Sequence, residues 1–240
     1  MIIIPARIGS SRFPNKVLAD IGGLPMVIRT AKAVQDIDRV AIATDSQEVI
    51  NIAKSYNIQA IMTSSEHHSG TDRIYEASEK LNLADSEIII NVQGDEPFIE
   101  TEVVQAIFDL TKANIHNDKI MMNSCYKRIN NPEADDPNIV KVVTDENDIA
   151  LYFSRAKVPY PRDHHFDEYK GHLGIYGFTK RSLSLFCQLK LSPLEDIEKL
   201  EQLRALYHGY QVAMVKVETE SFGIDTPEDL ERALAKNHIN

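Results

Sequence analysis

Short apolar runs alternate with amphipathic stretches through the first half of the chain. The apolar runs are continuous, which is typical of strands buried on both faces of a sheet, and we expect strands at 2–4, 40–43, 60–62 and 88–92. The stretches between them have helical periodicity, and we expect helices at 26–34, 48–56, 72–81 and 102–111. Strands separated by helices at this interval predict βαβ units. The first half is therefore expected to form a mainly parallel sheet with helices on both faces.

The pattern changes after about residue 120. Apolar runs at 120–126, 140–144 and 149–153 follow one another without intervening helices, and the loops contain Asn130-Asn131-Pro132 and Pro159-Tyr160-Pro161. This predicts an antiparallel, β-rich insertion at about 120–180, which we interpret as a dimerisation arm within a single domain spanning 1–240.

Helices are expected again at 180–189 and 193–208, followed by a strand at 212–217 and a helix at 227–235. The helix at 193–208 is predicted from apolar residues that recur at every third position and would face the core. These residues are Leu194, Ile197, Leu200, Leu203 and Leu206. Thr226 and Pro227, followed by two acidic residues, are a typical helix start.

Composition narrows the class of protein. The chain has 36 acidic and 26 basic side chains and a formal net charge of −10, which argues against general nucleic-acid binding. No apolar run approaches the roughly 20 residues that a membrane span needs, and the N-terminus has no secretory signal pattern. Cys125 and Cys187 have no companions at metal-site spacing. We therefore expect a cytoplasmic protein with reduced thiols and neither a membrane nor a nucleic acid as partner.

A cluster of cations follows the first predicted strand. Arg7, Arg12 and Lys16 lie in a small-residue turn with no acidic residue before Asp20. Backbone N–H groups in such a loop can point at phosphate oxygens while the cations neutralise them. The turn therefore indicates a phosphate site, with an ordinary βα turn carrying solvated charges as the alternative.

Three further segments fall where ligands bind in an open parallel sheet, beyond the carboxyl ends of strands. They are residues 69–73, 91–97 and 223–227. Two of them carry an aspartate, Asp95 and Asp225, and Mg²⁺ is commonly held by one or two carboxylates together with substrate phosphates. Taken separately, each aspartate is better explained as the cap of a turn or helix. Together with the cationic turn, they predict a magnesium site beside a triphosphate.

Other nucleotide-binding and metal motifs are absent from the sequence. There is no G-x-x-x-x-G-K-[ST] loop and no G-x-G-x-x-G after the first strand, so a P-loop enzyme and a dinucleotide-binding protein are both disfavoured. The adjacent pairs His67-His68 and His164-His165 are interpreted as solvated loop residues.

These motifs together resemble the 3-deoxy-manno-octulosonate (KDO) cytidylyltransferases, also called CMP-KDO synthetases. The resemblance covers nearly the whole chain, at residues 4–16, 43–45, 62–64, 69–73, 91–97, 140–143, 152–156, 159–162, 172–176, 200–204 and 223–229. The family often has Tyr and a Gly–Lys pair where this chain has Ile8 and Asn15-Lys16. Lys16 is retained, so the phosphate role is preserved.

The resemblance implies a Rossmann-like, three-layer α/β/α fold of the nucleotidyltransferase type and a homodimer. It also implies cytidylyl transfer from CTP to the anomeric hydroxyl of KDO, with Mg²⁺, for lipopolysaccharide synthesis. The implied CTP-binding residues are Pro5, Ala6, Arg7, Ser10, Arg12, Lys16, Ser69, Gly70 and Thr71. Arg12, Lys16, Asp95 and Asp225 are the implied catalytic residues, and the two aspartates are the implied metal ligands.

The carboxylate of the acid sugar needs hydrogen-bond donors on the protein. The implied sugar-binding residues are Arg73, Gln93, Arg155, His172, Tyr176 and Glu201. Structural alternatives remain open, because the two arginines are also expected as ion-paired surface groups and Glu201 has Lys199 and Arg204 as natural partners. The alternative acceptors are the 8-amino analogue of KDO and another acid sugar such as sialic acid. A nucleotide-sugar glycosyltransferase is a more distant alternative.

Overall fold

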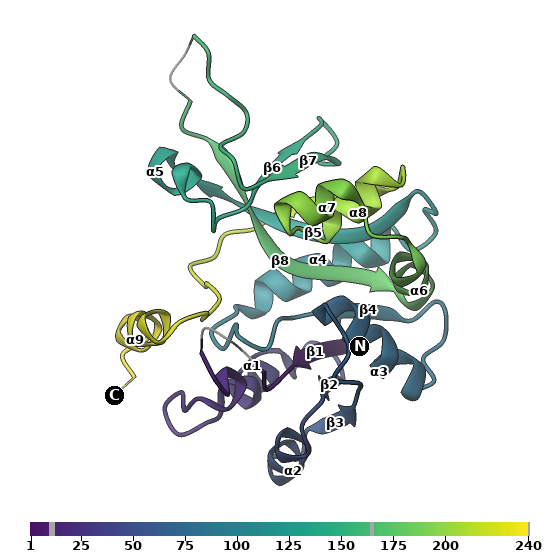
Figure 1. Ribbon diagram of the computed structural model, residues 1–240, viewed down its shortest axis with the longest axis vertical. Helices are drawn as coiled ribbons and strands as arrows, with labels where there is room; N and C mark the ends of the chain where they lie inside the picture. The colour runs from purple at the N-terminus through teal and green to yellow at the C-terminus, as the bar shows by residue number, and fades with distance from the viewer. Residues whose placement is uncertain (10–12, 164–165, 240) are drawn as a thin grey trace. The chain divides into compact units, whose positions relative to one another are not determined.

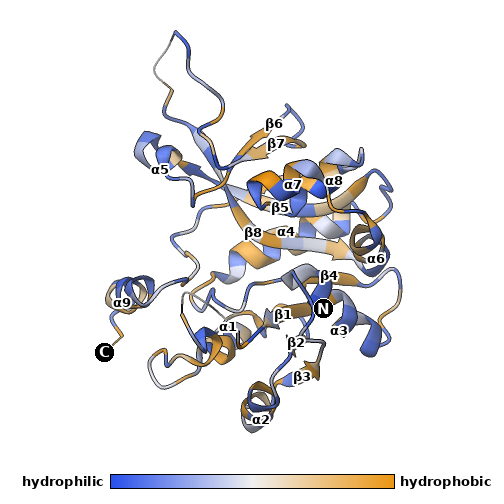
Figure 2. Ribbon diagram, viewed as in Figure 1, coloured by the Kyte–Doolittle hydropathy of each residue, from blue (hydrophilic) through white to orange (hydrophobic). Residues whose placement is uncertain are grey.

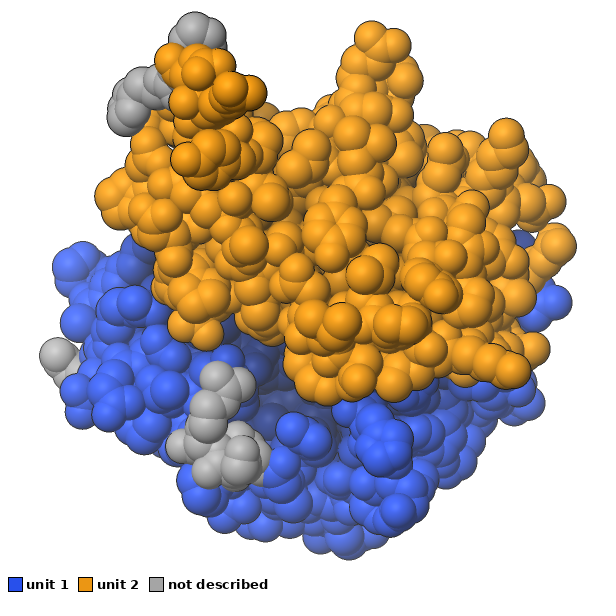
Figure 3. Space-filling view, turned by 45° about the horizontal axis from the view of Figure 1, so that its top comes forward, with its two compact units in different colours: residues 1–105, 220–240 blue, residues 106–219 orange. Residues whose placement is uncertain are grey.

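The computed structural model describes residues 1–9, 13–163 and 166–239. The chain forms two compact units (Figure 3), of which the first comprises Met1–Gln105 and Glu220–Asn240 and the second Ala106–Thr219. The second unit contains all of the predicted β-rich segment. The prediction of a single domain stays a prediction. No helix within the described ranges is long and apolar enough to cross a bilayer.

The first unit contains a parallel sheet of four strands (Figure 1). Its strands are β1 (Ile2–Ala6), β2 (Val40–Thr44), β3 (Gln59–Met62) and β4 (Ile88–Asn91). They lie in the order β3-β2-β1-β4, and every pair is parallel. The helices of this unit are α1 (Met26–Val34), α2 (Gln47–Ser55), α3 (Gly70–Lys80) and α9 (Pro227–Lys236), with a 3-10 turn η1 (Lys16–Leu18) after β1. The predicted parallel βαβ arrangement is therefore confirmed.

This strand order decides where a ligand can bind. The chain moves outward from β1 to β2 and β3, and then returns past β1 to β4. Because crossover connections are right-handed, α3 lies on the face of the sheet opposite to α1 and α2. The adjacent strands β1 and β4 therefore mark the switch point, beyond whose carboxyl end a crevice is expected.

Burial and capping explain why these segments take their form. Ile2, Ile3 and Ile4 are fully buried, and most of β1 is hydrophobic (Figure 2). Helix α3 begins at Gly70 rather than at residue 72, because the Ser69 side chain caps it by accepting a hydrogen bond from the backbone of the first turn. The predicted start of α9 is confirmed by a capping box at Thr226.

The second unit is built mainly from antiparallel strands. They are β5 (Ile120–Ile129), β6 (Lys141–Thr144), β7 (Ala150–Ser154), β8 (Tyr169–Thr179) and β9 (Gln211–Lys216). Strand β8 is antiparallel to β5 and β6, β6 is antiparallel to β7, and β9 is parallel to β5. The helices are α5 (Asn131–Asp135), α6 (Lys180–Gln188), α7 (Pro193–Glu198) and α8 (Gln202–Tyr207), while α4 (Thr101–Ala113) connects the two units along the chain. The expected antiparallel segment is confirmed.

Two predictions in the second unit need correction. The single helix expected at 193–208 is two helices, because Lys199 adopts the left-handed conformation (φ 53°) between α7 and α8. A three-residue spacing also drifts around a helix of 3.6 residues per turn, so Ile197 is 78% exposed while Leu203 is buried. Strand β8 was not predicted, because glycines interrupt its apolar run. One of them, Gly171, is needed because a Cβ there would lie 2.7 Å from Ile129 Cγ2.

Candidate active site

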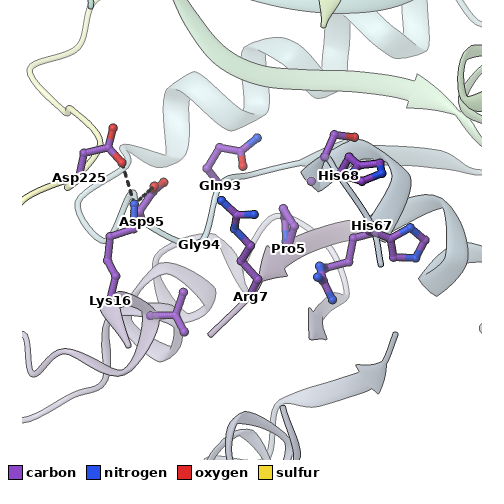
Figure 4. A pocket seen from close by; sticks show the side chains of 13 residues that line it. Pro5, Arg7, Lys16, His67, His68, Gln93, Gly94, Asp95 and Asp225 are labelled. Atoms are coloured by element: carbon purple, nitrogen blue, oxygen red, sulfur yellow. Dashed lines mark hydrogen bonds and ion pairs between the residues drawn. The ribbon is translucent and has the colours of Figure 1, made fainter. Parts of the chain in front are cut away.

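A pocket of about 280 Å³ lies in the first unit at the carboxyl ends of β1 and β4 (Figure 4). Its lining residues come from five segments that are distant in sequence: the end of β1 and the turn after it, η1, the start of α3, the turn after β4, and the segment before α9. They are Pro5, Arg7, Lys16, Val17, His67, His68, Ser69, Gly70, Arg73, Gln93, Gly94, Asp95 and Asp225. The pocket thus lies at the switch point of the sheet, and each of the four segments predicted to carry chemistry contributes to it.

Lys16 joins the two predicted carboxylates. Its Nζ atom lies 2.6 Å from Asp95 Oδ2 and 2.8 Å from Asp225 Oδ1, and both carboxylates point towards it in Figure 4. Burial by itself would lower the pKa of Lys16, but the charge and hydrogen bonds of the two carboxylates outweigh it and the pKa is raised. The ammonium group therefore stays charged and holds both aspartates at one point.

The donor set at this point suits a hard divalent cation. Two carboxylates converge on one positive group, and carboxylate oxygens are the ligands that Mg²⁺ prefers. Across the described residues, no group of three or more His, Cys, Asp or Glu side chains could hold a metal ion. The two carboxylates would therefore suit a Mg²⁺ ion held jointly with substrate oxygens and water, and they do not form a closed protein site.

Two glycines allow the backbone segments around the pocket to approach closely. A Cβ on Gly94 would lie 2.8 Å from the carbonyl oxygen of Pro5, so only glycine lets the turn after β4 pack against the end of β1. A Cβ on Gly70 would lie 3.0 Å from Pro5 Cγ and 3.4 Å from Gln93 Oε1. The start of α3 is therefore held against both strand ends.

The predicted CTP-binding residues fall into three groups by their location in the structure. Pro5, Arg7, Lys16, Ser69 and Gly70 line the pocket. Two others are buried beneath it: Ala6 is 1% exposed and Thr71 is fully buried, with its hydroxyl accepting a hydrogen bond from Asn91 Nδ2 at 3.4 Å. Ser10 and Arg12 lie outside the described residues, as do His164 and His165.

Two of the predicted sugar-binding residues, Gln93 and Arg73, also line this pocket. Arg73 is 2% exposed, and its guanidinium pairs with Asp45 (Nη2 to Oδ2, 3.1 Å) and donates to the Thr63 hydroxyl (2.7 Å). It is ion-paired, as the structural alternative expected, but it is buried and not a surface group. Asp45, which follows β2, is a residue whose role the sequence did not reveal.

Three other predicted sugar-binding residues, the partly buried His172 and Glu201 and the buried Tyr176, lie in the second unit. His172 Nε2 lies 2.9 Å from the Ser124 hydroxyl, and burial lowers the pKa of His172 to about 3, so the ring is neutral. The Tyr176 hydroxyl donates to Gln202 Oε1 at 3.0 Å. Burial, together with the charge of Glu201, raises the pKa of Tyr176 well above its ordinary value. These side chains form a neutral polar cluster beside one carboxylate.

The alternative partners of Glu201 make ion pairs elsewhere. Lys199 Nζ lies 2.6 Å from Asp196 Oδ1, and Arg204 forms two short contacts with Glu195. Each of these cations therefore has a carboxylate other than Glu201 as a direct partner.

Arg155, the remaining predicted sugar-binding residue, is held by neighbouring backbone. Its Nε atom donates to the Glu198 carbonyl (2.8 Å) and its Nη1 atom to the Pro137 carbonyl (3.0 Å). Its backbone N–H donates to the Glu198 carboxylate at 2.9 Å, and its own carbonyl accepts from Lys141. The guanidinium is thus oriented by hydrogen bonds to backbone carbonyls.

His67 and His68 lie in the loop before α3, as predicted, and His68 is exposed to solvent, but both also line the pocket. The His67 side chain is 21% exposed, and its Nε2 atom contacts the carboxylate of Glu76 in α3. One usable signal is present in the sequence, because both histidines directly precede the Ser69-Gly70 helix start. Nothing in the sequence indicates that His67 contacts Glu76.

The fold and this site define a nucleotidyltransferase. The sequence model of the family described as cytidylyltransferase matches residues 1–231, and the chain belongs to that family.

The chain is similar to relatives named 3-deoxy-manno-octulosonate cytidylyltransferase. That of a Nitratiruptor species is 56% identical, and the match covers 97% of both chains. Those of Wolinella succinogenes and Helicobacter pylori are 51% and 48% identical, covering 98% of this chain and 98% and 96% of their own.

Solved structures show the same fold. A structure of CMP:2-keto-3-deoxy-manno-octonic acid synthetase complexed with CTP superposes with a TM-score of 0.91 at 38% identity, covering 99% of this chain and 97% of its own. A cytidylyltransferase from Leptospira borgpetersenii has a TM-score of 0.61 at 17% identity and shares the fold. The predicted mixed α/β fold with a mostly parallel sheet is therefore confirmed.

Proposed function

We propose that this protein transfers the cytidylyl group of CTP to the anomeric hydroxyl of 3-deoxy-manno-octulosonate, giving CMP-KDO and pyrophosphate. The observation that carries the proposal is the convergence of Lys16, Asp95 and Asp225 in a pocket of a chain that is 56% identical to a relative of that name. The structural neighbour complexed with CTP supports the choice of nucleotide. The family and the relatives favour nucleotidyl transfer over the glycosyl transfer considered from sequence.

The residues of this chain position the triphosphate and neutralise its charge. Arg7 and Lys16, which line the pocket after β1, bind phosphate oxygens. The anomeric oxygen attacks the α-phosphorus in line, and the bond between the α-phosphorus and the bridging oxygen of the pyrophosphate breaks. Such a displacement depends mainly on orientation and on stabilisation of developing charge.

Asp95 and Asp225 would hold Mg²⁺. The ion would neutralise phosphate charge and polarise the α-phosphoryl group. The fit rests on the two carboxylates that share one positive group in the structure.

The predicted sugar-binding residues have polar side chains that suit the carboxylate and hydroxyl groups of an acid sugar. Gln93 and Arg73 line the pocket of the first unit, and Arg155, His172, Tyr176 and Glu201 lie in the second unit. We infer that they bind the carboxylate and hydroxyl groups of KDO. We further propose that the protein acts in the cytoplasm as a homodimer and supplies lipopolysaccharide synthesis.

Release of pyrophosphate tests the proposal. The protein is incubated with CTP, Mg²⁺ and KDO, with parallel reactions that contain a chelator, UTP in place of CTP, or a neutral sugar 1-phosphate in place of KDO. We expect release with CTP and KDO that depends on the metal. Release only with a different nucleotide or only with the neutral sugar would refute cytidylyl transfer to KDO.

A further reaction with the 8-amino analogue of KDO tests acceptor choice. Faster turnover of that analogue than of KDO would reassign the substrate but leave the reaction class unchanged. Size-exclusion chromatography with light scattering tests the homodimer, and a monomeric mass would contradict it.

A further inference from the structure

His67 lines the pocket at the end furthest from the aspartates, and it forms a polar pair with Glu76. In Figure 4, Lys16 lies with Asp95 and Asp225 at one end of the lining, and His67 lies at the other. His67 reaches the pocket from the loop before α3, and Glu76 approaches it from α3 itself. The two side chains are 21% and 25% exposed, so the pair is largely shielded from solvent.

Glu76 is fixed in both position and charge. Its Oε1 atom lies 2.7 Å from Lys80 Nζ, and its Oε2 atom accepts a hydrogen bond from the backbone N–H of Ser64 at 2.8 Å. Burial would raise the pKa of Glu76, but these donors and His67 lower it from 4.5 to about 2. The carboxylate is therefore ionised at any pH at which the protein works.

This carboxylate decides which nitrogen of His67 carries the proton. An ionised carboxylate accepts hydrogen bonds and donates none, so the Nε2 atom in contact with Glu76 is the protonated one. In a neutral imidazole the other nitrogen, Nδ1, is then an acceptor. A histidine whose second nitrogen is held by a carboxylate is fixed in ring orientation as well as in tautomer, as in the outer shell of metal sites.

The placement of charge in the pocket determines which part of a nucleotide meets this acceptor. The phosphates belong beside Lys16 and Arg7, so the nucleoside extends from the α-phosphate towards the far end of the pocket, where His67 lies. Cytosine has an amino group, a donor, at the position where uracil has a carbonyl, an acceptor. An acceptor on the protein therefore favours cytosine and faces a repulsive oxygen in uracil.

We propose that His67, positioned by Glu76, determines nucleotide specificity by accepting a hydrogen bond from the cytosine amino group at Nδ1. The inference rests on the cytidylyl transfer proposed above and adds a selectivity mechanism to it. Glu76 touches no substrate in this account and is a positioning residue.

The substitution Glu76→Gln tests the tautomer. A glutamine amide can donate to Nε2, which moves the proton to Nδ1 and makes that atom a donor suited to the uracil carbonyl. We expect the ratio of kcat/KM for CTP to that for UTP to fall by about 10-fold or more, the scale of discrimination that a polar contact in a pocket provides. Because both nucleotides are compared on one preparation, the ratio is insensitive to the fraction of folded protein. Glu79→Gln, the same charge change at an exposed position of α3, is the control and should keep the wild-type ratio.

A second variant separates His67 from Glu76. His67→Ala removes the hydrogen-bond acceptor, so the ratio of kcat/KM for CTP to that for UTP should fall in this variant also. Calorimetric titration with CTP and with UTP, in the absence of any sugar substrate, should show the same loss of preference for CTP. An unchanged ratio in both variants would overturn the inference while leaving cytidylyl transfer intact. A fall in His67→Ala alone would overturn the tautomer role of Glu76. Failure of the wild-type protein to bind CTP would instead refute the proposed function itself.

Discussion

Replacing Asp225 by asparagine separates a role in chemistry from a role in folding. The Asp225 side chain is 45% exposed and shares Lys16 with Asp95, whose side chain is 26% exposed. Asparagine keeps the shape and removes the charge. Lys16 retains its closer partner, Asp95, and partly exposed ion pairs contribute little to folding, so we expect the free energy of unfolding to change by less than about 1 kcal/mol.

The same substitution should strongly reduce turnover. A carboxylate that holds the metal at the reacting phosphate stabilises charge in the transition state, and loss of one such group lowers kcat by about 10²–10³-fold, or about 2.7–4 kcal/mol. The assay is pyrophosphate release at saturating CTP and KDO, combined with urea unfolding of the same samples. We therefore expect a large loss of turnover with almost no change in the free energy of unfolding.

The control is Glu228→Gln, which removes a negative charge from an exposed position in the first turn of α9, close to Asp225 in sequence. It should retain wild-type turnover and stability. Near-normal kcat in Asp225→Asn would remove Asp225 from the metal site. An equal loss of turnover in Glu228→Gln would show that the effect comes from the change in net charge and is not specific to the Asp225 carboxylate.

Three further predictions concern stability, measured by urea unfolding. Asp45→Ala leaves the buried Arg73 guanidinium without its carboxylate and should cost about 3–5 kcal/mol, and a cost below about 1 kcal/mol would contradict a buried pair. Gly94→Ala should cost about 1–3 kcal/mol because its Cβ meets backbone at 2.8 Å, whereas Gly9→Ala, with no atom within 4 Å, should be neutral. Burial lowers the pKa of His172 from 6.5 to about 3, so its contribution is complete above about pH 6.5 and is lost as the pH falls towards 3. In His172→Gln this part of the acid destabilisation, on the order of a few kcal/mol, should disappear, and an unchanged pH profile would contradict the buried neutral ring.

Much of the first unit could be predicted because periodicity and capping agree there. The strand at 88–92 and the helix at 26–34 are found almost where their patterns place them. The meeting of Asp95 with Asp225 is a long-range contact, yet it could be predicted, because one follows a parallel strand and the other precedes a helix at the same sheet edge.

Other features could not be predicted because they depend on tertiary contacts. Lysine has no preference for the left-handed conformation, so nothing in the sequence marks Lys199 as a helix break. Strand β8 is stabilised by pairing with β5 and β6 and not by its own apolar pattern. The contact of His67 with Glu76 depends on the path of a loop that carries no periodic signal.

The double ion pair of Lys16 has a consequence for the order in which ligands arrive. The protein supplies its own counter-ion to Asp95 and Asp225, so a free divalent ion must compete with an ammonium group that is already in place. A bound nucleotide would change this competition, because its phosphates would offer Lys16 a new anionic partner and leave the two carboxylates available to hold the metal. Magnesium and CTP should therefore enter together as one complex, and the bare ion should bind weakly on its own.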